Sequence, residues 1–299
     1  MNKAAAPSIT RTLRLLIGTL LMILSGMGFA QTTVDPDWAQ LPAGTNWDGS
    51  TSWITADKQG NVIVLVRTPP YFRVFTRDGV PVRSFGEAGQ FDTAHSIGVD
   101  PDGNYWVSDS TWHVVRKFSP DGELLMTLGQ QGVAGDNTST DKFNQPNHVA
   151  FAPNGDVYVS DGYVNARVVH FTKDGEFVRI IGGTQGSEPG QLQVPHGVAI
   201  DSQGRILVND SDNARVSVVA PDGTFVESWP FPSRGGIEVL PDDTVYVSDV
   251  NAGIVNIVKD GELLDSVAVD RAHGLGVDTN GDIYVSGASR MTVYKVTRP

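Results

Sequence analysis

The 299-residue sequence contains no cysteine, so neither a disulfide nor a thiolate contributes to its structure or chemistry. Stability must come from the burial of apolar side chains, for which a chain of this length is sufficient. Cysteine metal ligands, a cysteine nucleophile and a lipid attached through an N-terminal cysteine are excluded. Long helical patterns are also scarce, whereas 33 glycines and 17 prolines favour short strands joined by turns.

Basic residues are in the minority, because 22 Lys and Arg stand against 34 Asp and Glu and give a formal net charge of -12. A surface of this sign repels phosphate backbones and anionic lipid headgroups. We therefore expect no nucleic-acid partner and no insertion of the mature protein into a membrane.

The first thirty residues have the pattern of a secretory signal peptide. Lys3, Arg11 and Arg14 precede an apolar run over residues 15–27 that is short for a membrane span, and small residues follow it. Removal of residues 1–30 takes away three basic and no acidic residues, so the net charge becomes -15. We expect the remaining domain, residues 31–299, to be secreted or periplasmic and monomeric.

One phrase recurs six times: an apolar strand, a tight polar turn and a second, alternating strand. A third strand follows each copy, and an Asp-Gly hairpin such as Asp78-Gly79 follows five of them. The turn positions are 38 to 52 residues apart, the length of a four-stranded propeller blade. The sequence therefore predicts an all-β fold, a six-bladed β-propeller. The turn positions are Gly60, Gly103, Gly155, Gly204, Asp243 and Gly281.

The sixth copy stops after its third strand, at residues 296–299. A strand edge left unpaired is prone to aggregation, so an N-terminal segment should supply the missing outer strand. Residues around 38–41, which precede the first full repeat, are the predicted closing strand.

The innermost strand of each blade lines the central channel, and it starts eight residues before each turn position. On blades two, four and six this position is a histidine, and alternate blades stand about a third of a turn apart. Three converging imidazoles with an open fourth position suit a catalytic Zn²⁺. A single histidine here would favour a structural hydrogen-bonding role, but three in equivalent register favour a metal site. The six positions are Ser52, His95, Asn147, His196, Gly235 and His273.

The other histidines are predicted to be structural. His148 is one residue out of register, so its side chain should point to the opposite face of its strand. His113 and His170 are predicted on blade strands. The acidic residues that end the second strands recur from blade to blade, which indicates hydrogen bonds that join turns and blades. These are Asp109, Asp161, Asp210 and Asp249.

Two loops between second and third strands add polar side chains to the same mouth, Arg67 in blade one and Tyr163 in blade three. The ordinary pKa of tyrosine is about 10, but a nearby metal and guanidinium would favour the phenolate. Arg67 could supply that cation or bind a substrate carboxylate. Each residue also has a structural alternative, in which Tyr163 packs on a loop and Arg67 pairs with a repeated aspartate.

The repeats resemble those of NHL-repeat propellers, and within them peptidyl-α-hydroxyglycine α-amidating lyase. The resemblance covers roughly residues 45–297 and is strongest in HSIGVDPDGNYWVSD, QPNHVAFAPNGDVYVSDGYVNARVVHF and VPHGVAI. It implies a zinc ion at the channel mouth, a small peptide or amide substrate, and cleavage of an α-hydroxyglycine amide to an amide and glyoxylate. In that family three histidines hold zinc while a tyrosine and an arginine complete the site, and the matching residues are His95, His196, His273, Tyr163 and Arg67.

Three positions depart from the family pattern. Gly274 stands where the family has an acidic residue that binds a structural Ca²⁺, which argues against calcium here. Val164 replaces a cysteine of animal members. Arg271 replaces a methionine two residues before the third histidine, and an arginine so close to zinc could alter the choice of substrate.

Two other functions remain open from the sequence. The first is a non-enzymatic NHL-repeat scaffold that binds a protein, peptide or glycan on its top face. A scaffold, however, has no need to keep the histidines, Arg67 and Tyr163 together in space. The second is a calcium-dependent lactonase-like propeller, whose channel would be lined by carboxylates and asparagine rather than by histidine.

Overall fold

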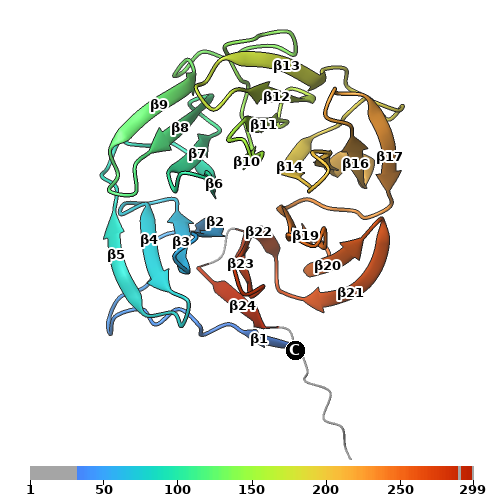
Figure 1. Ribbon diagram of the computed structural model, residues 1–299. Coiled ribbons are helices and arrows are strands. Elements are labelled where there is room, and N and C mark those ends of the chain that lie inside the picture. Colours follow the sequence, from blue (N-terminus) through green and yellow to red (C-terminus); the bar gives the residue numbers. More distant parts are fainter. Residues whose placement is uncertain (1–31, 289–290, 298–299) are drawn as a thin grey trace, which may run out of the picture. The chain divides into compact units, whose positions relative to one another are not determined.

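The computed structural model describes residues 32–288 and 291–297, which form six four-stranded antiparallel sheets placed as blades around one axis (Figure 1). The predicted all-β, six-bladed propeller is confirmed. The predicted signal peptide lies outside the described residues, and the domain boundary at residue 31 stays a prediction. No helix in the described part of the chain is long and apolar enough to cross a membrane.

Each blade runs outward from the axis, strand by strand. The innermost strands are β2 (Thr51–Ala56), β6 (Ala94–Val99), β10 (His148–Phe151), β14 (Pro195–Ile200), β18 (Ile237–Val239) and β22 (Ala272–Val277). The second strands are β3 (Asn61–Val66), β7 (Tyr105–Asp109), β11 (Val157–Asp161), β15 (Ile206–Asp210), β19 (Val245–Asp249) and β23 (Ile283–Gly287).

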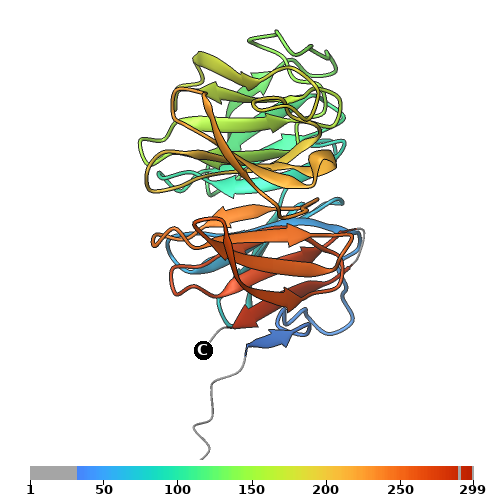
Figure 2. The same cartoon turned by 90° about the vertical axis from the view of Figure 1, so that its right-hand side faces the viewer.

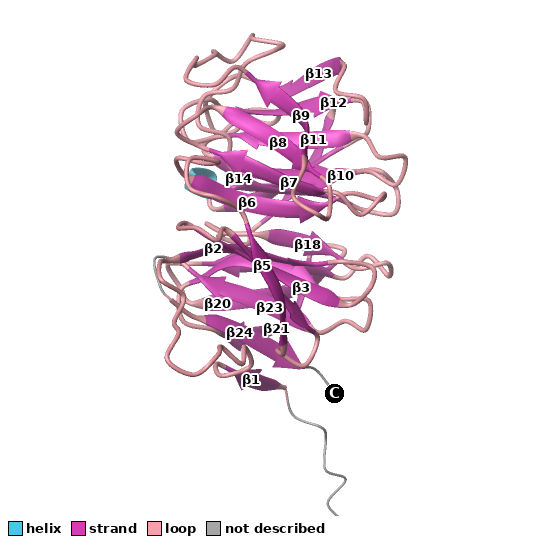
Figure 3. Ribbon diagram, turned by 90° about the vertical axis from the view of Figure 1, so that its left-hand side faces the viewer, coloured by secondary structure: helices cyan, strands magenta, loops and turns pink. Residues whose placement is uncertain are grey.

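The outer half of each blade completes the sheet. The third strands are β4 (Phe72–Thr76), β8 (Val114–Phe118), β12 (Arg167–Phe171), β16 (Arg215–Val219), β20 (Ile254–Lys259) and β24 (Val293–Thr297). The outermost strands are β5 (Pro81–Phe85), β9 (Leu124–Gly129), β13 (Phe177–Gly182), β17 (Phe225–Trp229), β21 (Glu262–Ala268) and β1 (Thr33–Asp35). The short 3-10 helix Ser211–Asn213 is the one helical segment among the described residues, and loops emerge on both faces of the ring (Figure 3).

The burial of the strands decreases from the axis outward, in agreement with the apolar and polar patterns of their sequences. β11 (VYVSD) is buried at all five positions, whereas β5 exposes four of its five residues. A blade is covered on both faces by its neighbours, so its second strand carries apolar residues on both sides. Six clusters of buried side chains accordingly lie between adjacent blades; one joins Phe72 of blade one to Tyr105 and Phe118 of blade two.

The ring closes through an N-terminal strand, as expected, but the predicted residues were wrong. β1 pairs with β24, with Val34 opposite Val296, and the two strands lie side by side in Figures 1 and 2. Trp38, which was predicted to lie in this strand, is buried instead with its ring 5.0 Å from that of Tyr284. Burial of the Trp38 indole in the core stabilises the fold more than its placement on an exposed outer strand would. The more polar residues 33–35 therefore form the closing strand.

The repeated aspartates have the structural role that the sequence predicted. Asp109 accepts backbone N–H groups from Asp92 and Thr93 in the loop before β6, and it thereby fixes the entry to the innermost strand. Asp161 forms a fully buried ion pair with Arg167, at 2.9 Å. These carboxylates hold the upper loops in place, because a buried charge must be paired and hydrogen-bonded.

The two remaining histidines differ from each other. His170 lies in β12, as predicted, and its Nε2 is 3.0 Å from Asp156. The prediction for His113 was wrong, because it lies in the turn before β8 with φ of 58°. Its Nδ1 accepts the backbone N–H of Gln145, a loop contact that the repeat pattern does not reveal.

Candidate metal centre

Three histidines from alternate blades converge on the propeller axis, as their register predicted. One ring nitrogen from each of His95, His196 and His273 can be chosen so that all three lie within 4.8 Å of one another. All three residues are buried, with exposures of 1%, 1% and 6%. The side chains form a compact set of nitrogen donors, which we call the histidine cluster.

Backbone carbonyls fix which nitrogen of each ring faces the axis. The Nδ1 atoms of His95, His196 and His273 lie 2.7, 3.0 and 3.0 Å from backbone oxygens. A carbonyl only accepts a hydrogen bond, so each Nδ1 carries the proton and each Nε2 keeps its lone pair. Such a hydrogen bond, made by the ring nitrogen that does not face the metal, orients an imidazole for metal binding. The oxygens belong to Asn147, Gly235 and Ser52, each at the start of the next blade's inner strand.

The protonation state of the histidine cluster suits a metal. Burial, reinforced by the neighbouring histidines, holds the pKa values of His95 and His196 well below the usual range. Burial also lowers the pKa of His273 to about 4. The rings are therefore neutral near pH 7, which is the form that binds a metal ion. Three neutral imidazoles with aligned lone pairs fit Zn²⁺ with one position left open.

Tyr163 lies directly over the cluster. Its hydroxyl is 2.8 Å from Nε2 of His95 and 3.3 Å from Nε2 of His196. Because these nitrogens only accept, the hydroxyl donates. The residue as a whole is 36% exposed, so the ring reaches the surface while the hydroxyl end lies inside. Burial raises the pKa of Tyr163, and Arg67, Arg234 and Asn147 oppose that effect.

Arg67 lies beside the cluster, where its position in the loop after β3 was expected to place it. Its Nε donates to Oγ of Ser52, at 3.2 Å, and its charge lowers the pKa values of His95 and His273. The structure therefore brings together the five site residues predicted from the sequence.

Two residues near Tyr163 were missed. Asn147 is fully buried, its Oδ1 accepts the N–H of Gly162, and its amide group lowers the pKa of Tyr163. Arg234 is a second cation at this mouth, 3.9 Å from Asp212, and it lowers the pKa values of Tyr163 and His196. Asn147 occupies the register position of the histidines, which was the available signal. Arg234 lies in an irregular loop with no such signal.

A buried indole supports the cluster from below. Trp53 is fully buried, and its ring centroid is 5.2 to 6.0 Å from those of the three cluster histidines. On its other side it stacks on His148, at 4.7 Å. Trp53 therefore closes the axis between the histidine cluster and the opposite end of the propeller.

Gly274 explains how the indole fits. A Cβ at this position would come within 2.9 Å of the Trp53 ring and 2.8 Å of its Cα, so a larger residue would displace it. Gly274 also offers no side-chain oxygen, and oxygen ligands are what Ca²⁺ requires. Gly274 therefore supplies no carboxylate for a Ca²⁺ ion, and the expectation against calcium stays a prediction.

The neighbouring residues His148 and Arg271 are not part of the cluster. The side chain of His148 points away from it, as predicted from its register, and burial lowers the pKa of this ring to about 3. Arg271 donates from Nε to the backbone oxygen of Ala288 while its charge lowers the pKa of His273.

Comparisons with known proteins support the propeller architecture and identify the family of the chain. Residues 97–248 match the SMP-30/gluconolactonase/LRE-like region. The chain belongs to this family. A solved structure described as a gluconolactonase from Xanthomonas campestris matches this chain with 16% identity and a TM-score of 0.68. The match covers 85% of this chain and 89% of the solved chain, which shows the shared fold.

Two curated relatives are more similar in sequence. The probable peptidyl-alpha-hydroxyglycine alpha-amidating lyase of Caenorhabditis elegans is 33% identical over 233 residues, which cover 71% of this chain and 66% of that protein. The peptidyl-glycine alpha-amidating monooxygenase of Mus musculus is also 33% identical over 233 residues, which cover 69% of this chain. The match spans 24% of the length of the mouse protein.

Proposed function

We propose that this protein is an exported, zinc-dependent lyase that cleaves an α-hydroxyglycine amide to an amide and glyoxylate. The observation that carries the proposal is the convergence of three imidazoles, each with its Nδ1 proton held by a backbone carbonyl, beneath the hydroxyl of Tyr163. The lyase name of the worm relative supports the reaction class.

The reaction needs a proton to move between two atoms of the substrate. The bond between the amide nitrogen and the hydroxylated carbon breaks, the hydroxyl loses its proton as the aldehyde of glyoxylate forms, and the amide nitrogen gains a proton. Zinc, when bound, supplies a Lewis acid that lowers the pKa of a nearby hydroxyl. The remaining task is proton transfer and positioning, which the side chains of the chain can perform.

Tyr163 is placed for the proton transfer. Its hydroxyl lies at the open side of the histidine cluster, and Arg67 opposes the rise in pKa that burial imposes on this phenol. With zinc bound and the neighbouring cations favouring ionisation, Tyr163 would act as the phenolate, take the proton from the substrate hydroxyl and return it to the departing nitrogen. Arg67 and Arg234, two cations near Tyr163, would bind the carboxylate of the hydroxyglycine unit.

Metal content of the purified protein tests the site first. Elemental mass spectrometry should find about one zinc per chain, and the variant His95→Ala/His196→Ala/His273→Ala should lose it. The single variant His170→Gln, at a blade histidine far from the axis, is the matched control and should keep the metal. Absence of transition metal after zinc is added back would refute the zinc site and favour a binding scaffold.

Glyoxylate release tests the reaction. Benzoyl-α-hydroxyglycine should yield benzamide and glyoxylate with the wild-type protein, and Tyr163→Phe should keep its zinc while losing about 100-fold or more in turnover. A zinc-loaded protein that hydrolyses lactones but releases no glyoxylate would instead assign the site to the hydrolytic branch suggested by the family description.

A further inference from the structure

A cavity of about 510 Å³ lies at the end of the axis opposite the histidine cluster. Trp53 and His148 separate the two, and the lining reaches the turns between first and second strands at Lys58, Pro101 and Pro153. Its size falls within the range of small-molecule sites. We call it the lower cavity.

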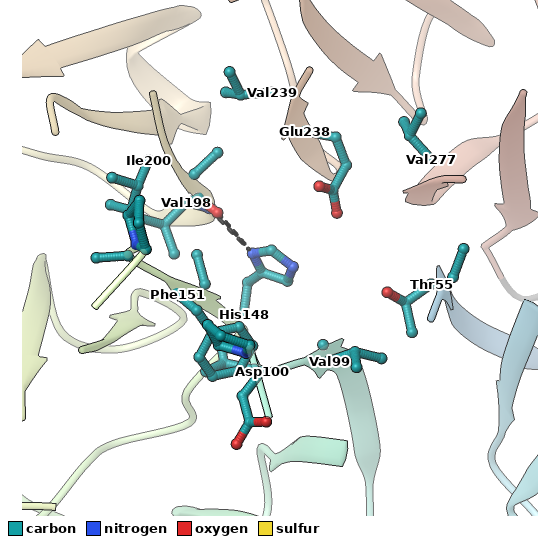
Figure 4. Close-up of a pocket in the computed structure, with 18 of the residues that line it drawn as sticks. Thr55, Val99, Asp100, His148, Phe151, Val198, Ile200, Glu238, Val239 and Val277 are labelled. Carbon is teal, nitrogen blue, oxygen red and sulfur yellow. Dashed lines mark hydrogen bonds between the residues drawn. The ribbon is translucent and has the colours of Figure 1, made fainter. Parts of the chain in front are cut away.

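Three polar side chains face one another across this cavity (Figure 4). Thr55 comes from β2, His148 from β10 and Glu238 from β18, which are the inner strands of blades one, three and five. The histidine cluster uses blades two, four and six. The rest of the lining is mainly apolar, with Val198, Ile200 and similar residues around the polar centre.

His148 forms part of the cavity wall, with one ring nitrogen in contact with the backbone and the other directed into the cavity. The residue is 3% exposed, and its Nδ1 lies 3.1 Å from the carbonyl oxygen and 3.2 Å from the amide nitrogen of Val198. Figure 4 shows Nε2 on the far side of the ring, toward the middle of the cavity. When Nδ1 donates to the Val198 carbonyl, Nε2 is a hydrogen-bond acceptor; when Nδ1 instead accepts the Val198 N–H, Nε2 carries the proton. A bound ammonium would select the first tautomer.

Glu238 brings a carboxyl group to the same point. Its side chain points from β18 toward His148, and burial raises its pKa to about 8. Burial is the cause of this shift, and among the described residues no cation forms an ion pair with the carboxyl group. A carboxyl group in such surroundings gains most from a ligand that brings its own positive charge.

The approach to the lower cavity is negatively charged. An adjoining cavity, which shares Glu238, Lys58 and three other lining residues with it, is lined by Asp57, Asp242 and Asp278. Asp242 pairs with Lys259 and Asp278 with Arg77, which leaves Asp57 and Glu238 as the carboxyl groups without an ion pair among the described residues of this lining. Among the described residues that line the two cavities, Lys58 is the one cation, and its Nζ donates to the carbonyl oxygen of Pro101. The surroundings therefore favour a cationic ligand over an anionic one.

The donor set does not favour a metal ion. Of the three inward-facing groups, only His148 and Glu238 are strong metal ligands, and the described residues group three such ligands at the histidine cluster alone. A primary ammonium, in contrast, has three N–H donors, and the lower cavity offers an imidazole nitrogen, a carboxylate and a hydroxyl as acceptors.

We propose that the lower cavity binds a small primary amine as its ammonium, with Glu238, His148 and Thr55 accepting its three hydrogen bonds and the apolar wall enclosing its carbon chain. The ion pair with Glu238 provides the charge recognition, and the two neutral acceptors set the geometry. This site is separate from the zinc site, so the proposal does not depend on the lyase activity.

Calorimetry with two pairs of probes tests the proposal on the purified, zinc-loaded protein. Butylamine and phenethylamine are compared with butanol and 2-phenylethanol, which keep the carbon chain and lack the charge. We expect saturable binding of the amines and at least about 10-fold weaker binding of the alcohols, one tenfold step being about 1.4 kcal/mol. Amine binding at pH 7 should release a proton from Glu238, which is measured by repeating the titration in buffers of different ionisation enthalpy.

Two isosteric variants and one control complete the experiment. Glu238→Gln should lose at least about 10-fold in amine affinity together with the proton release, while Thr55→Val should lose less. Glu227→Gln, at an exposed position on β17, should change neither. Zinc content is measured in every sample, so that damage to the histidine cluster is recognised separately. No amine binding at millimolar concentration, or equal binding by Glu238→Gln, would overturn the proposal, as would alcohols that bind as tightly as amines.

Discussion

The two ends of the propeller axis carry three inward-facing polar side chains each, from complementary sets of blades. The histidine cluster takes one residue from each of blades two, four and six, and the lower cavity takes Thr55, His148 and Glu238 from blades one, three and five. In the first set the members are identical and occupy one register. In the second set the members differ in type: Thr55 and Glu238 share one register, five residues before their turn positions, and His148 lies two residues earlier in its strand.

This difference is reflected in how the two ends are supported. Each cluster histidine donates Nδ1–H to the start of the next blade's inner strand, so neighbouring blades fix its tautomer. At the lower end only His148 has such a backbone contact, and Glu238 depends on desolvation alone for its perturbed pKa. The end that holds the histidine cluster therefore fixes the geometry of its three imidazoles, whereas the lower cavity suits a ligand that supplies charge.

Trp53 holds the two ends apart, and its removal should have the largest effect on stability. Trp53→Ala deletes a fully buried indole that touches all three cluster histidines and His148, so we expect a loss of about 3 to 5 kcal/mol in the free energy of unfolding. Urea unfolding measures this loss. Val164→Ala, at an exposed loop position, should stay within about 0.5 kcal/mol; comparable losses in both would contradict the role of Trp53.

The metal should distinguish the two ends sharply. His196→Ala removes one of three ligands and should weaken zinc binding by more than about 100-fold, beyond the effect of losing a supporting hydrogen bond. Glu238→Gln, at the opposite end, should leave zinc affinity unchanged. Competition with a chromogenic chelator measures both, and a similar loss in the two variants would mean that the ends are not independent.

The pH dependence of stability should come in part from the lower end. The folded-state pKa of Glu238 is about 8 and the ordinary value is about 4.5, so the unfolded chain releases its proton first as pH rises. The stabilisation is complete below about pH 4.5 and is lost as pH rises through 8. The other titratable groups that line the same two cavities are His148, Lys58, Asp57, Asp100, Asp242 and Asp278.

Glu238→Gln should therefore flatten this part of the curve. Relative to wild type, the variant should gain on the order of 5 °C in unfolding midpoint at pH 8.5 and little at pH 5. Thermal unfolding at the two pH values measures the difference, with Glu227→Gln as the exposed control. An equal shift at both pH values would show that packing rather than ionisation is responsible.

Tyr163→Phe should have the smallest effect on stability. The ring stays in place, and the loss is limited to the hydrogen bond from its hydroxyl to the histidine cluster, about 1 kcal/mol or less. Unfolding in urea, with zinc present and absent, measures it. A loss of several kcal/mol would make Tyr163 a structural residue rather than a group reserved for the reaction.

Much of this was predictable from the sequence because a repeat places equivalent residues at equivalent points in space. Six copies of one phrase determined the six blades, and the register of His95, His196 and His273 determined their convergence. Tyr163 and Arg67 were predictable because their loops open on the same face as the starts of the inner strands.

Only the tertiary structure decided the rest, since it depends on contacts between residues that follow no shared pattern. The closing strand is Thr33–Asp35 because burial of the Trp38 ring stabilises the fold more than its placement in the outer strand would. Trp53 fills the axis because Gly274 leaves room for its ring. His148 and Glu238 occupy different register positions on different blades, so no repeat unit predicts their meeting. Sequence fixes periodic placement, whereas side-chain length, packing and desolvation in three dimensions determine which non-equivalent residues share a cavity.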